Sequence, residues 1–250
     1  MSDQLGFPFV SFVLPAYNES SLIENTLERL NLNFKNNGFP YEILVVDDGS
    51  VDTTRSKAIL YSLSNRNVKV ISHEKNFGKG YAVNKGFKKA KGSAVIFFDS
   101  DADIEVEQIN LFLNALRTRD IVIGSKWHPD SEVDMSLLRK VFSRAFNITA
   151  RLLTGLKITD TQTGIKAVKR DAFLDIFSHL CVKRYAFDVE LLVLAKIYGL
   201  KVTEVPVKLK IKKVFSLRES CHMLMDLLGI TYRLRITKWY QSEVSKVPNF

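Results

Sequence analysis

Residues 41–54 read YEILVVDDGSVDTT, and this stretch indicates the fold more strongly than any other. Its apolar part, residues 43–46, is continuous and runs directly into Asp47, Asp48 and the turn-forming Gly49. A short apolar run that ends in turn residues predicts a strand buried on both faces. This stretch alone does not identify the groups that its two terminal carboxylates contact.

Other apolar, β-rich runs occur along the chain, at residues 9–16 (FVSFVLPA), 68–72 (VKVIS), 94–101 (AVIFFDSD) and 120–125 (DIVIGS). Amphipathic stretches that suit helices separate them. This alternation predicts an α/β fold in which helices flank a mainly parallel sheet. Acids or polar turns follow three of the runs, in LPAYNE, VVDDGS and FFDSDAD. Because ligands bind beyond the carboxyl ends of strands in such sheets, we expect these polar ends to meet at one crevice.

Size and composition suit a soluble globular domain. The chain has 250 residues, 46% of them apolar and 25% charged, and no linker rich in Gly, Pro or Ser divides it. We therefore expect one domain over residues 1–250, with a first half at 1–130 and a second half at 131–250 that carries longer amphipathic helices and basic segments.

Targeting signals are not evident. The opening MSDQLGFPFV lacks the basic and apolar regions of a secretory signal, and no apolar run reaches the roughly 18 residues of a spanning helix. Cys181 and Cys221 stand in apolar surroundings without metal-ligand spacing. We expect buried free thiols and a reducing, cytosolic setting.

Positive charge is concentrated towards the end of the chain. The formal net charge is +9, and from Lys201 onward ten Lys or Arg residues stand against four acids. Such a segment favours a polyanion or an anionic membrane surface as partner, without choosing between them.

Three carboxylates are spaced by two in FFDSDAD, at Asp99, Asp101 and Asp103. Carboxylates this close raise each other's pKa unless a cation lies among them, and a hard divalent ion such as Mg²⁺ suits oxygen ligands and substrate phosphates. The alternative is a solvated acidic turn. Since the acids follow a buried strand, the metal site is the favoured interpretation.

An anion site is indicated where Gly78 and Gly80 bracket Lys79, just after a strand and at the start of a helical stretch. Free N–H groups at a helix N-terminus and a Lys attract phosphate. The segment is neither a P-loop nor a dinucleotide fingerprint, because the third glycine of the latter is replaced by Val83. An ordinary glycine turn is an equal alternative.

Taken together, these segments resemble the family 2 glycosyltransferases of GT-A fold. The matching segments are LPAYNE (14–19), VVDDGSVDTT (45–54), NFGKGYAVNKG (76–86) and DSDAD (99–103), in the family's order and at its usual spacing. The second half resembles more narrowly the polyprenyl-phosphate hexose synthases, which make dolichyl-phosphate glucose or mannose. That resemblance lies in residues 124–170 and 187–210, and the Gln-x-x-Arg-Trp motif of processive synthases is not seen.

The resemblance implies a role for each polar cluster. Asp48 would contact the uracil or ribose of a nucleotide sugar, and Asp47 would buttress the turn. The full nucleotide-sugar set is Pro15, Ala16, Tyr17, Glu19, Val46, Asp48, Asn76, Lys79, Asp99, Ser100 and Asp101. Asp101 and Asp103 would hold Mg²⁺ or Mn²⁺. The implied catalytic set is Asp101, Lys126, Asp160, Lys212 and Lys213, and the acceptor phosphate would be bound by Lys126, Arg139 and Arg144.

Departures from the family pattern bear on the sugar. Lys126 stands where Arg is usual, which keeps the charge but loses bidentate phosphate binding. KKVFSL (212–217) replaces the Gly-x-Ser-Lys of mannose synthases, and DTQTG (160–164) is closer to the glucose-transferring members. Glucose from UDP-glucose is therefore slightly favoured over mannose from GDP-mannose. The alternative is a family 2 glycosyltransferase that uses a different acceptor.

The implied chemistry is metal-dependent, inverting transfer of a hexose to a polyprenyl (dolichyl) phosphate. A lipid phosphate is already an anion and attacks without a strong protein base, so positioning and electrostatics would supply the catalysis. An α-linked donor would give a β-linked product.

Two amphipathic segments favour contact with a membrane. In residues 136–153, Lys140, Arg144, Asn147 and Arg151 form one stripe, while Leu137, Val141, Ile148 and Leu152 form another. Leu217, Cys221, Leu224 and Leu228 likewise oppose Arg218, His222, Asp226 and Arg233. We expect peripheral attachment to the cytoplasmic face of a membrane, with a membrane-embedded subunit as a possible anchor. Ordinary core packing is the alternative.

Two rival classes of protein fit the sequence less well. A basic protein could bind nucleic acid, yet no recognition-helix or aromatic ribonucleoprotein motif is present, so no nucleic-acid partner is expected. A nucleotidyltransferase could also use an acidic metal site, and release of pyrophosphate would distinguish it.

Overall fold

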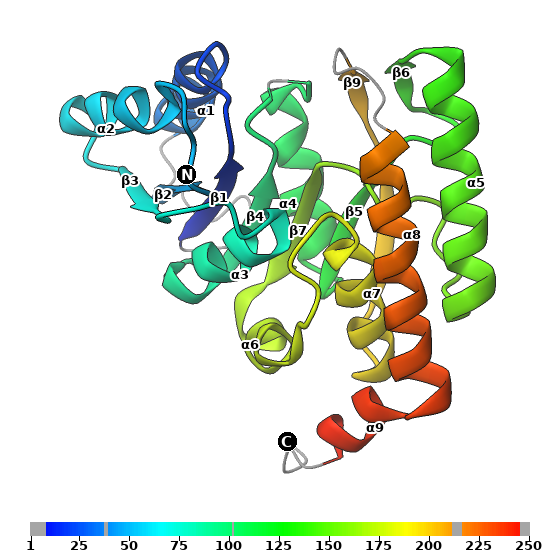
Figure 1. The fold of residues 1–250 in the computed structure, drawn as a ribbon. Helices are drawn as coiled ribbons and strands as arrows, with labels where there is room; N and C mark the ends of the chain where they lie inside the picture. The colour runs from blue at the N-terminus through cyan, green and yellow to red at the C-terminus, as the bar shows by residue number, and fades with distance from the viewer. Residues whose placement is uncertain (1–8, 38–39, 102, 212–216, 246–250) are drawn as a thin grey trace.

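The computed structural model describes residues 9–37, 40–101, 103–211 and 217–245. Seven strands of the described chain form one sheet: β1 (Val10–Ala16), β2 (Tyr41–Asp47), β3 (Val68–Ser72), β4 (Ala94–Phe98), β5 (Ile121–Ser125), β7 (Ile165–Lys169) and β8 (Val202–Pro206). Their order is β3-β2-β1-β4-β7-β5-β8, and all neighbours are parallel except those of β7 (Figure 1). The short strands β6 (Glu132–Asp134) and β9 (Lys208–Lys210) pair separately.

Helices cover both faces of the sheet. One face packs against α1 (Ile23–Asn37), α2 (Thr54–Ser64) and α4 (Ile109–Leu116), and the other against α3 (Lys79–Lys89), α6 (Arg170–His179) and α7 (Phe187–Ile197). Neighbouring strand residues point into opposite layers: Phe12 joins the first core and Val13 the second. Burial on both faces explains why these strands are continuously apolar. The expected α/β architecture with flanking helices is confirmed.

Strand β7 was not anticipated, although it lies in the interior of the sheet. It runs antiparallel between β4 and β5, so the second half of the chain completes the sheet begun by the first. Its sequence, IKAVK, does not read as a buried strand, because Lys166 interrupts the apolar residues. That lysine is buried, and its Nζ lies 2.9 Å from Asp188 Oδ1 on α7. A buried charge needs such a partner, and the partner is 22 residues away in the chain.

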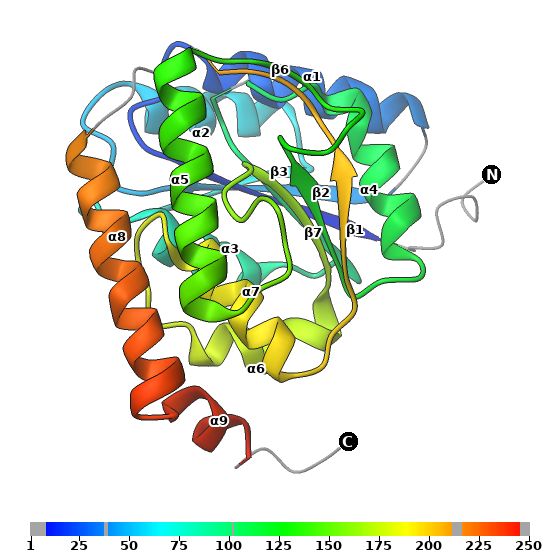
Figure 2. The same ribbon diagram turned by 90° about the vertical axis from the view of Figure 1, so that its right-hand side faces the viewer.

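Helices α5 (Leu137–Thr154) and α8 (Leu217–Thr231) lie side by side at the end of the molecule away from β3 (Figures 1 and 2). The expected apolar stripe of α5 is exposed: Leu137 is 78% and Leu152 72% accessible. The polar stripe was wrong at one position, because Asn147 is buried together with Ala150 and Thr154. Core packing of the apolar stripe is thus excluded, and α5 rests on the protein through a third face.

Helix α8 shows the same arrangement. Leu227 and Ile230 are buried, whereas a row of apolar side chains is exposed on α8 and the π-helical turn that follows it, at Leu224, Met225, Leu228, Tyr232 and Ile236. Arg233, expected on the polar face, instead reaches inward, and its Nε donates to the hydroxyl of Tyr240 on α9 (Trp239–Val244). Within the described residues, none of the helices has the length and hydropathy required to cross a bilayer.

The two cysteines depart from expectation. Both Cys181 and Cys221 are free, as predicted, but both are exposed rather than buried. Cys181 lies in the turn after α6 and Cys221 on the outer side of α8, so apolar neighbours in sequence did not mean burial in the fold.

Candidate active site at the carboxyl edge of the sheet

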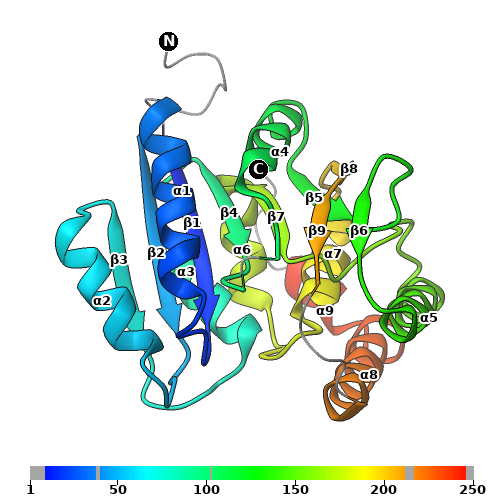
Figure 3. The same ribbon diagram turned by 90° about the horizontal axis from the view of Figure 1, so that it is seen from above.

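The polar ends of β1, β2 and β4 meet at one edge of the sheet, as the strand pattern predicted (Figure 3). The backbone N–H of Asp48 donates to the carbonyl of Ala16 at 2.9 Å. The hydroxyl of Ser100 donates to the carbonyl of Pro15, also at 2.9 Å. These bonds tie residues that follow three neighbouring strands into one surface, with Val46 buried behind it.

Asp48 organises the loop that leads into α3. Its Oδ1 accepts from the N–H of Phe77 at 3.1 Å and lies 2.8 Å from His73 Nδ1, and its Oδ2 accepts from the N–H of Gly78 at 2.7 Å. Gly78 has a φ of +104°, and a Cβ there would lie 2.4 Å from the Lys183 carbonyl oxygen. Only glycine therefore brings this N–H to the carboxylate. Any contact of Asp48 with a ligand would add to this loop-holding role.

Asp47 acts within the turn. Its Oδ1 accepts from the N–H of Ser50 at 3.3 Å, as expected of a residue that buttresses the turn. Its Oδ2 is buried without a hydrogen-bond partner in the described structure.

Lys79 and Asp99 form the ionic centre of this edge. Lys79 Nζ lies 2.6 Å from Asp99 Oδ1 and 2.9 Å from Oδ2. Burial alone would lower the pKa of Lys79, but the carboxylates of Asp99, Asp188 and Asp101 outweigh it and raise that pKa, so the ammonium stays charged. The charged Lys79 ammonium therefore lies at the start of α3, where the anion site was expected.

Asp101 and Asp103 follow Asp99 beyond β4, and both are half-buried. The N–H of Asp103 lies 3.4 Å from Asp101 Oδ1, so the two carboxylates share one turn. Within the described residues, no group of three or more His, Cys, Asp or Glu side chains is arranged to hold a metal. Two carboxylates from one turn nevertheless suit an ion such as Mg²⁺ or Mn²⁺ that takes its other ligands from water and substrate phosphates.

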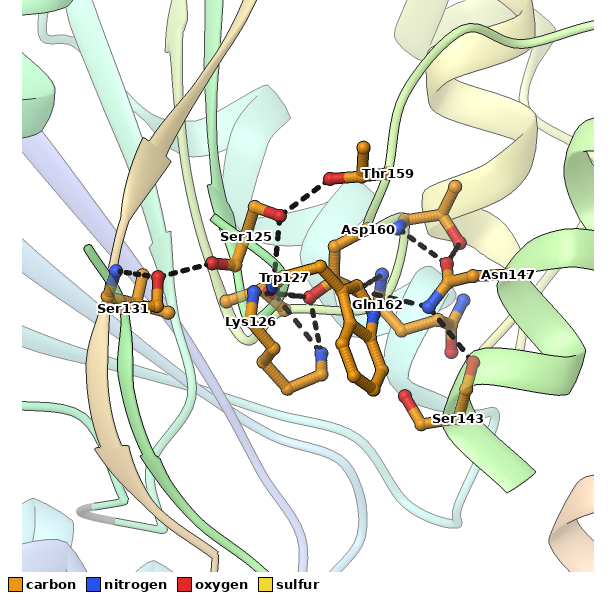
Figure 4. Close-up of polar contacts among 12 residues, drawn as sticks. Ser125, Lys126, Trp127, Ser131, Ser143, Asn147, Thr159, Asp160 and Gln162 are labelled. Carbon is orange, nitrogen blue, oxygen red and sulfur yellow. Dashed lines mark hydrogen bonds and ion pairs between the residues drawn. The ribbon is translucent and has the colours of Figure 1, made fainter. Parts of the chain in front are cut away.

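A second ionic pair lies at the end of β5, where Lys126 meets Asp160 (Figure 4). Lys126 Nζ is 2.7 Å from Asp160 Oδ2, and the backbone N–H of Lys126 donates to the same oxygen at 2.9 Å. Burial would raise the pKa of Asp160, but the Lys126 ammonium and the hydroxyl of Thr163 outweigh it and hold that pKa at about 2. Two residues of the expected catalytic set thus form one buried unit.

The loop of Asp160 joins this pair to the first ionic centre. The N–H of Asp99 donates to the carbonyl of Gly164 at 3.0 Å. A Cβ on Gly164 would lie 2.2 Å from Asp99 Oδ2, so only glycine permits this approach. The carboxylates of Asp99 and Asp160 therefore flank one short loop, and the two ionic pairs are neighbours.

Three residues that hold this loop were not anticipated. Glu204 on β8 accepts from the N–H groups of Thr159 and Asp160 at 3.0 and 3.1 Å, and Asn147 on α5 accepts from the N–H of Thr161 at 2.9 Å. Thr163 donates to Asp160 Oδ2 at 2.6 Å. An acid inside the apolar run VTEVPV was a signal for Glu204. For Asn147 the helical stripe pointed to solvent, which is wrong.

The basic residues expected around an acceptor phosphate are only partly gathered. The guanidinium of Arg144 lies over the ring of Trp127, 5.4 Å from its centroid, next to Lys126 (Figure 4 draws Trp127 and Lys126). Arg139 lies in the first turn of α5, where its N–H donates to Ser136 Oγ. Lys212 and Lys213 lie outside the described residues.

The remaining nucleotide-sugar residues lie around the same edge. Tyr17 and Asn76 are exposed beside it, and Glu19 is buried with its N–H donating to Thr54 Oγ1 at 2.7 Å.

Comparisons with known proteins identify similar chains. The dolichyl-phosphate beta-glucosyltransferases of Homo sapiens and Drosophila melanogaster are 32% and 33% identical to the chain, over 95% of its length and over 79% and 78% of theirs. One from Trichomonas vaginalis is 32% identical, over 92% of this chain and 75% of its own.

A solved structure has the same fold. Glucosyl-3-phosphoglycerate synthase from Mycobacterium tuberculosis, in complex with Mn²⁺, uridine-diphosphate and glucosyl-3-phosphoglycerate, superposes with a TM-score of 0.70 at 20% identity, over 90% of this chain and 80% of that one. This likeness confirms the GT-A type of α/β fold. The sequence model of glycosyl transferase family 2 matches residues 11–177. The chain is therefore a glycosyltransferase and belongs to glycosyl transferase family 2.

Proposed function

We propose that this enzyme transfers glucose from UDP-glucose to dolichyl phosphate at a membrane surface. The observation that carries the proposal is the position of the buried Lys126–Asp160 pair: it lies beside the Lys79–Asp99 centre and beneath α5, whose outer side is apolar. A phosphate on an apolar chain needs both a cation and an apolar surface close to the donor. The relatives named dolichyl-phosphate beta-glucosyltransferases support glucose over mannose.

On the donor side, the segments after β1, β2 and β4 would bind the nucleotide, and Lys79 would face the diphosphate. Asp101 and Asp103 would hold Mg²⁺ or Mn²⁺, whose chemistry there is to offset the negative charge gained by the leaving diphosphate. Residues 1–130 would thus form the nucleotide-sugar half of one domain, and residues 131–250 the acceptor half.

On the acceptor side, Lys126, Arg139 and Arg144 would bind the lipid phosphate, with Lys212 or Lys213 offsetting repulsion between the two phosphate groups. One phosphate oxygen would attack the anomeric carbon as the bond from that carbon to the β-phosphate oxygen breaks. UDP leaves with the bonding electrons, and attack from the opposite face inverts the centre. No proton has to be removed from the acceptor, so Asp160 would hold Lys126 rather than act as a base.

The expected test of this function is a two-donor assay. The enzyme is incubated with dolichyl phosphate, Mg²⁺ or Mn²⁺, and either labelled UDP-glucose or labelled GDP-mannose, and the lipid is extracted into organic solvent. Label should enter the lipid phase from UDP-glucose. Label from GDP-mannose alone would reverse the sugar assignment, and label from neither donor would refute the acceptor.

Asp48→Ala is expected to raise the KM for UDP-glucose more than it lowers kcat. The change frees the N–H groups of Phe77 and Gly78 and loosens the loop that delivers Lys79 to the donor. Lost binding that is equal in the ground and transition states appears in KM. Steady-state kinetics with varied donor would measure it, and an unchanged donor KM would contradict the role.

The membrane would be met by the exposed apolar side chains of α5, α8 and the turn after α8. Helix α5 carries Arg139, Lys140, Arg144 and Arg151 and no acid. Each basic residue near an anionic surface adds about 1 kcal/mol of attraction. We propose that these two helices attach the enzyme peripherally, on the cytoplasmic face, with or without a membrane-embedded partner subunit.

The double change L152E/L228E is expected to weaken binding to anionic vesicles about tenfold for each leucine removed, since each buried leucine is worth roughly 1.5 kcal/mol or more. Co-sedimentation at low and high salt measures it, and high salt should release the wild type only in part. The matched control is L60E/L63E on α2, where both leucines are also exposed. Equal binding by the two double variants would refute this face as the membrane contact.

A further inference from the structure

Asn147 is a buried polar residue on the helix whose outer side is apolar. It is 3% exposed, and it points from α5 to the loop of Asp160 (Figure 4). Its Oδ1 accepts from the N–H and the hydroxyl of Thr161, at 2.9 and 3.0 Å. Its Nδ2 donates to the Ser143 carbonyl at 3.0 Å and lies 3.5 Å from Asp160 Oδ1.

These partners demand asparagine. A backbone N–H can only donate and a carbonyl can only accept, so the contacts with Thr161 and Ser143 fix which end of the amide faces which partner. A leucine of similar size would make neither contact. An aspartate would set a second carboxylate against the Ser143 carbonyl and Asp160.

The contact with Thr161 determines where Asp160 lies. Thr161 is adjacent to Asp160 in the chain, and its side chain and backbone are both held by α5. Glu204 holds the other side of the loop through the N–H groups of Thr159 and Asp160. Removing Asn147 leaves one of these two supports, so Asp160, and with it the Lys126 ammonium, can shift.

We propose that Asn147 is a positioning residue that holds the Asp160–Lys126 pair where Lys126 would contact the acceptor phosphate. Asn147 thereby connects the 159–164 loop to α5, the helix that would lie on the membrane. The inference rests on the proposed function for its catalytic consequence. Its structural core, the fixing of the 159–164 loop by α5, does not. A displacement of about 1 Å in such a pair lowers kcat by up to roughly 100-fold.

The first test compares Asn147→Ala with Thr149→Ala. Thr149 lies on the same helix, but its hydroxyl donates to the Ala145 carbonyl within α5. Alanine favours helix at both positions, so α5 itself should persist. Hydrogen exchange of the 159–164 segment should accelerate in N147A and stay as in the wild type in T149A. Unchanged exchange in N147A overturns the inference, whatever the enzyme transfers.

Kinetics supply the catalytic part. N147A should lower kcat by roughly 10- to 100-fold while the KM for UDP-glucose stays within about twofold, because the donor site is untouched. A kcat within about twofold of wild type, measured on folded protein, overturns the catalytic role. If the wild type itself moves no glucose while N147A still loosens the loop, the proposed function fails and the positioning stands.

Asn147→Asp keeps the inference testable if N147A does not fold. A protonated carboxyl has the same shape as the amide, can accept from Thr161 and can donate to Ser143. The charged group in contact with residue 147 is Asp160, and around Asp160 lie Lys126 after β5, Glu204 from β8 and Lys166 from β7. Burial and Asp160 should raise its pKa, so the activity of N147D relative to wild type should be highest at low pH and fall as pH rises. A pH-independent ratio overturns the inference.

Discussion

Asp101→Ala is expected to abolish glucose transfer. Of the three carboxylates after β4, Asp99 makes two contacts with Lys79, at 2.6 and 2.9 Å, and so serves as the counterion of that lysine. Asp101 is the next carboxylate on the same turn and would be the principal ligand of the divalent ion. Loss of that ligand removes several kcal/mol of stabilisation from the leaving diphosphate, which corresponds to a fall in kcat on the order of 1000-fold.

The measurement is label transfer at saturating Mn²⁺, with thermal unfolding as a check on the fold. Asp103→Ala should be severe but less complete. Asp171→Ala is the matched control, since this aspartate lies on α6 with its side chain 89% exposed. Near-normal turnover of Asp101→Ala with metal present would show that the cation site has been misplaced.

The second large effect is expected from separating Lys126 and Asp160. The Asp160 side chain is fully buried and that of Lys126 is 6% exposed, so neither can replace its partner with water. Breaking one side of a buried pair leaves an unpaired charge and costs about 3–5 kcal/mol. Asp160→Asn and Lys126→Met should each lower the free energy of unfolding by about that amount and reduce transfer to background.

The double variant K126M/D160N separates stability from function. With both charges removed, unfolding free energy should largely recover, because no unpaired charge remains. Transfer should not recover, because the buried Lys126 ammonium proposed to face the acceptor phosphate is then missing. Activity in the double variant would contradict the catalytic role of Lys126, and stability losses that simply add would contradict the pairing.

The same pair predicts a pH dependence. Lys126 and Thr163 hold the pKa of Asp160 at about 2, below the value of about 3.9 for an unfolded aspartate. A depressed carboxyl pKa stabilises the fold above the unfolded pKa. This contribution, about 2 to 3 kcal/mol, is lost as pH falls from about 4 to about 2. The stability difference between wild type and Asp160→Asn should therefore narrow across that window in chemical denaturation.

Much of the fold could be predicted because the information is local. Residues 43–46 and 94–98 are continuously apolar since their strands are covered on both faces, and such runs can be recognised without knowing their neighbours. The polar ends after β1, β2 and β4 could be brought together in advance for the same reason: parallel strands place their carboxyl ends at one edge. The gathering of polar residues at this edge of the sheet was thus largely foreseeable.

The interior strand β7 could not be foreseen in the same way. Its second residue, Lys166, contradicts a buried strand until Asp188 on α7 is placed beside it. The helical periodicity of the sequence also could not show which face of α5 packs against the protein, since that helix has an apolar, a basic and a mixed face. The contact of Asn147 with the loop and the burial of Ala150 in the core decided which face turned inward.

What the sequence by itself determined is the α/β class, the positions of the first strands along the chain, the acidic clusters at their ends and the family. Only the tertiary structure decided that Lys126 pairs with Asp160 across 34 residues, that Asn147 and Glu204 hold the loop between them, and that the leucines of α5 remain outside. The physical reason is the range of the interactions. Strand burial and turn formation depend on residues that are neighbours in the sequence. The partner of a buried charge or amide depends instead on segments that meet only after the chain has folded.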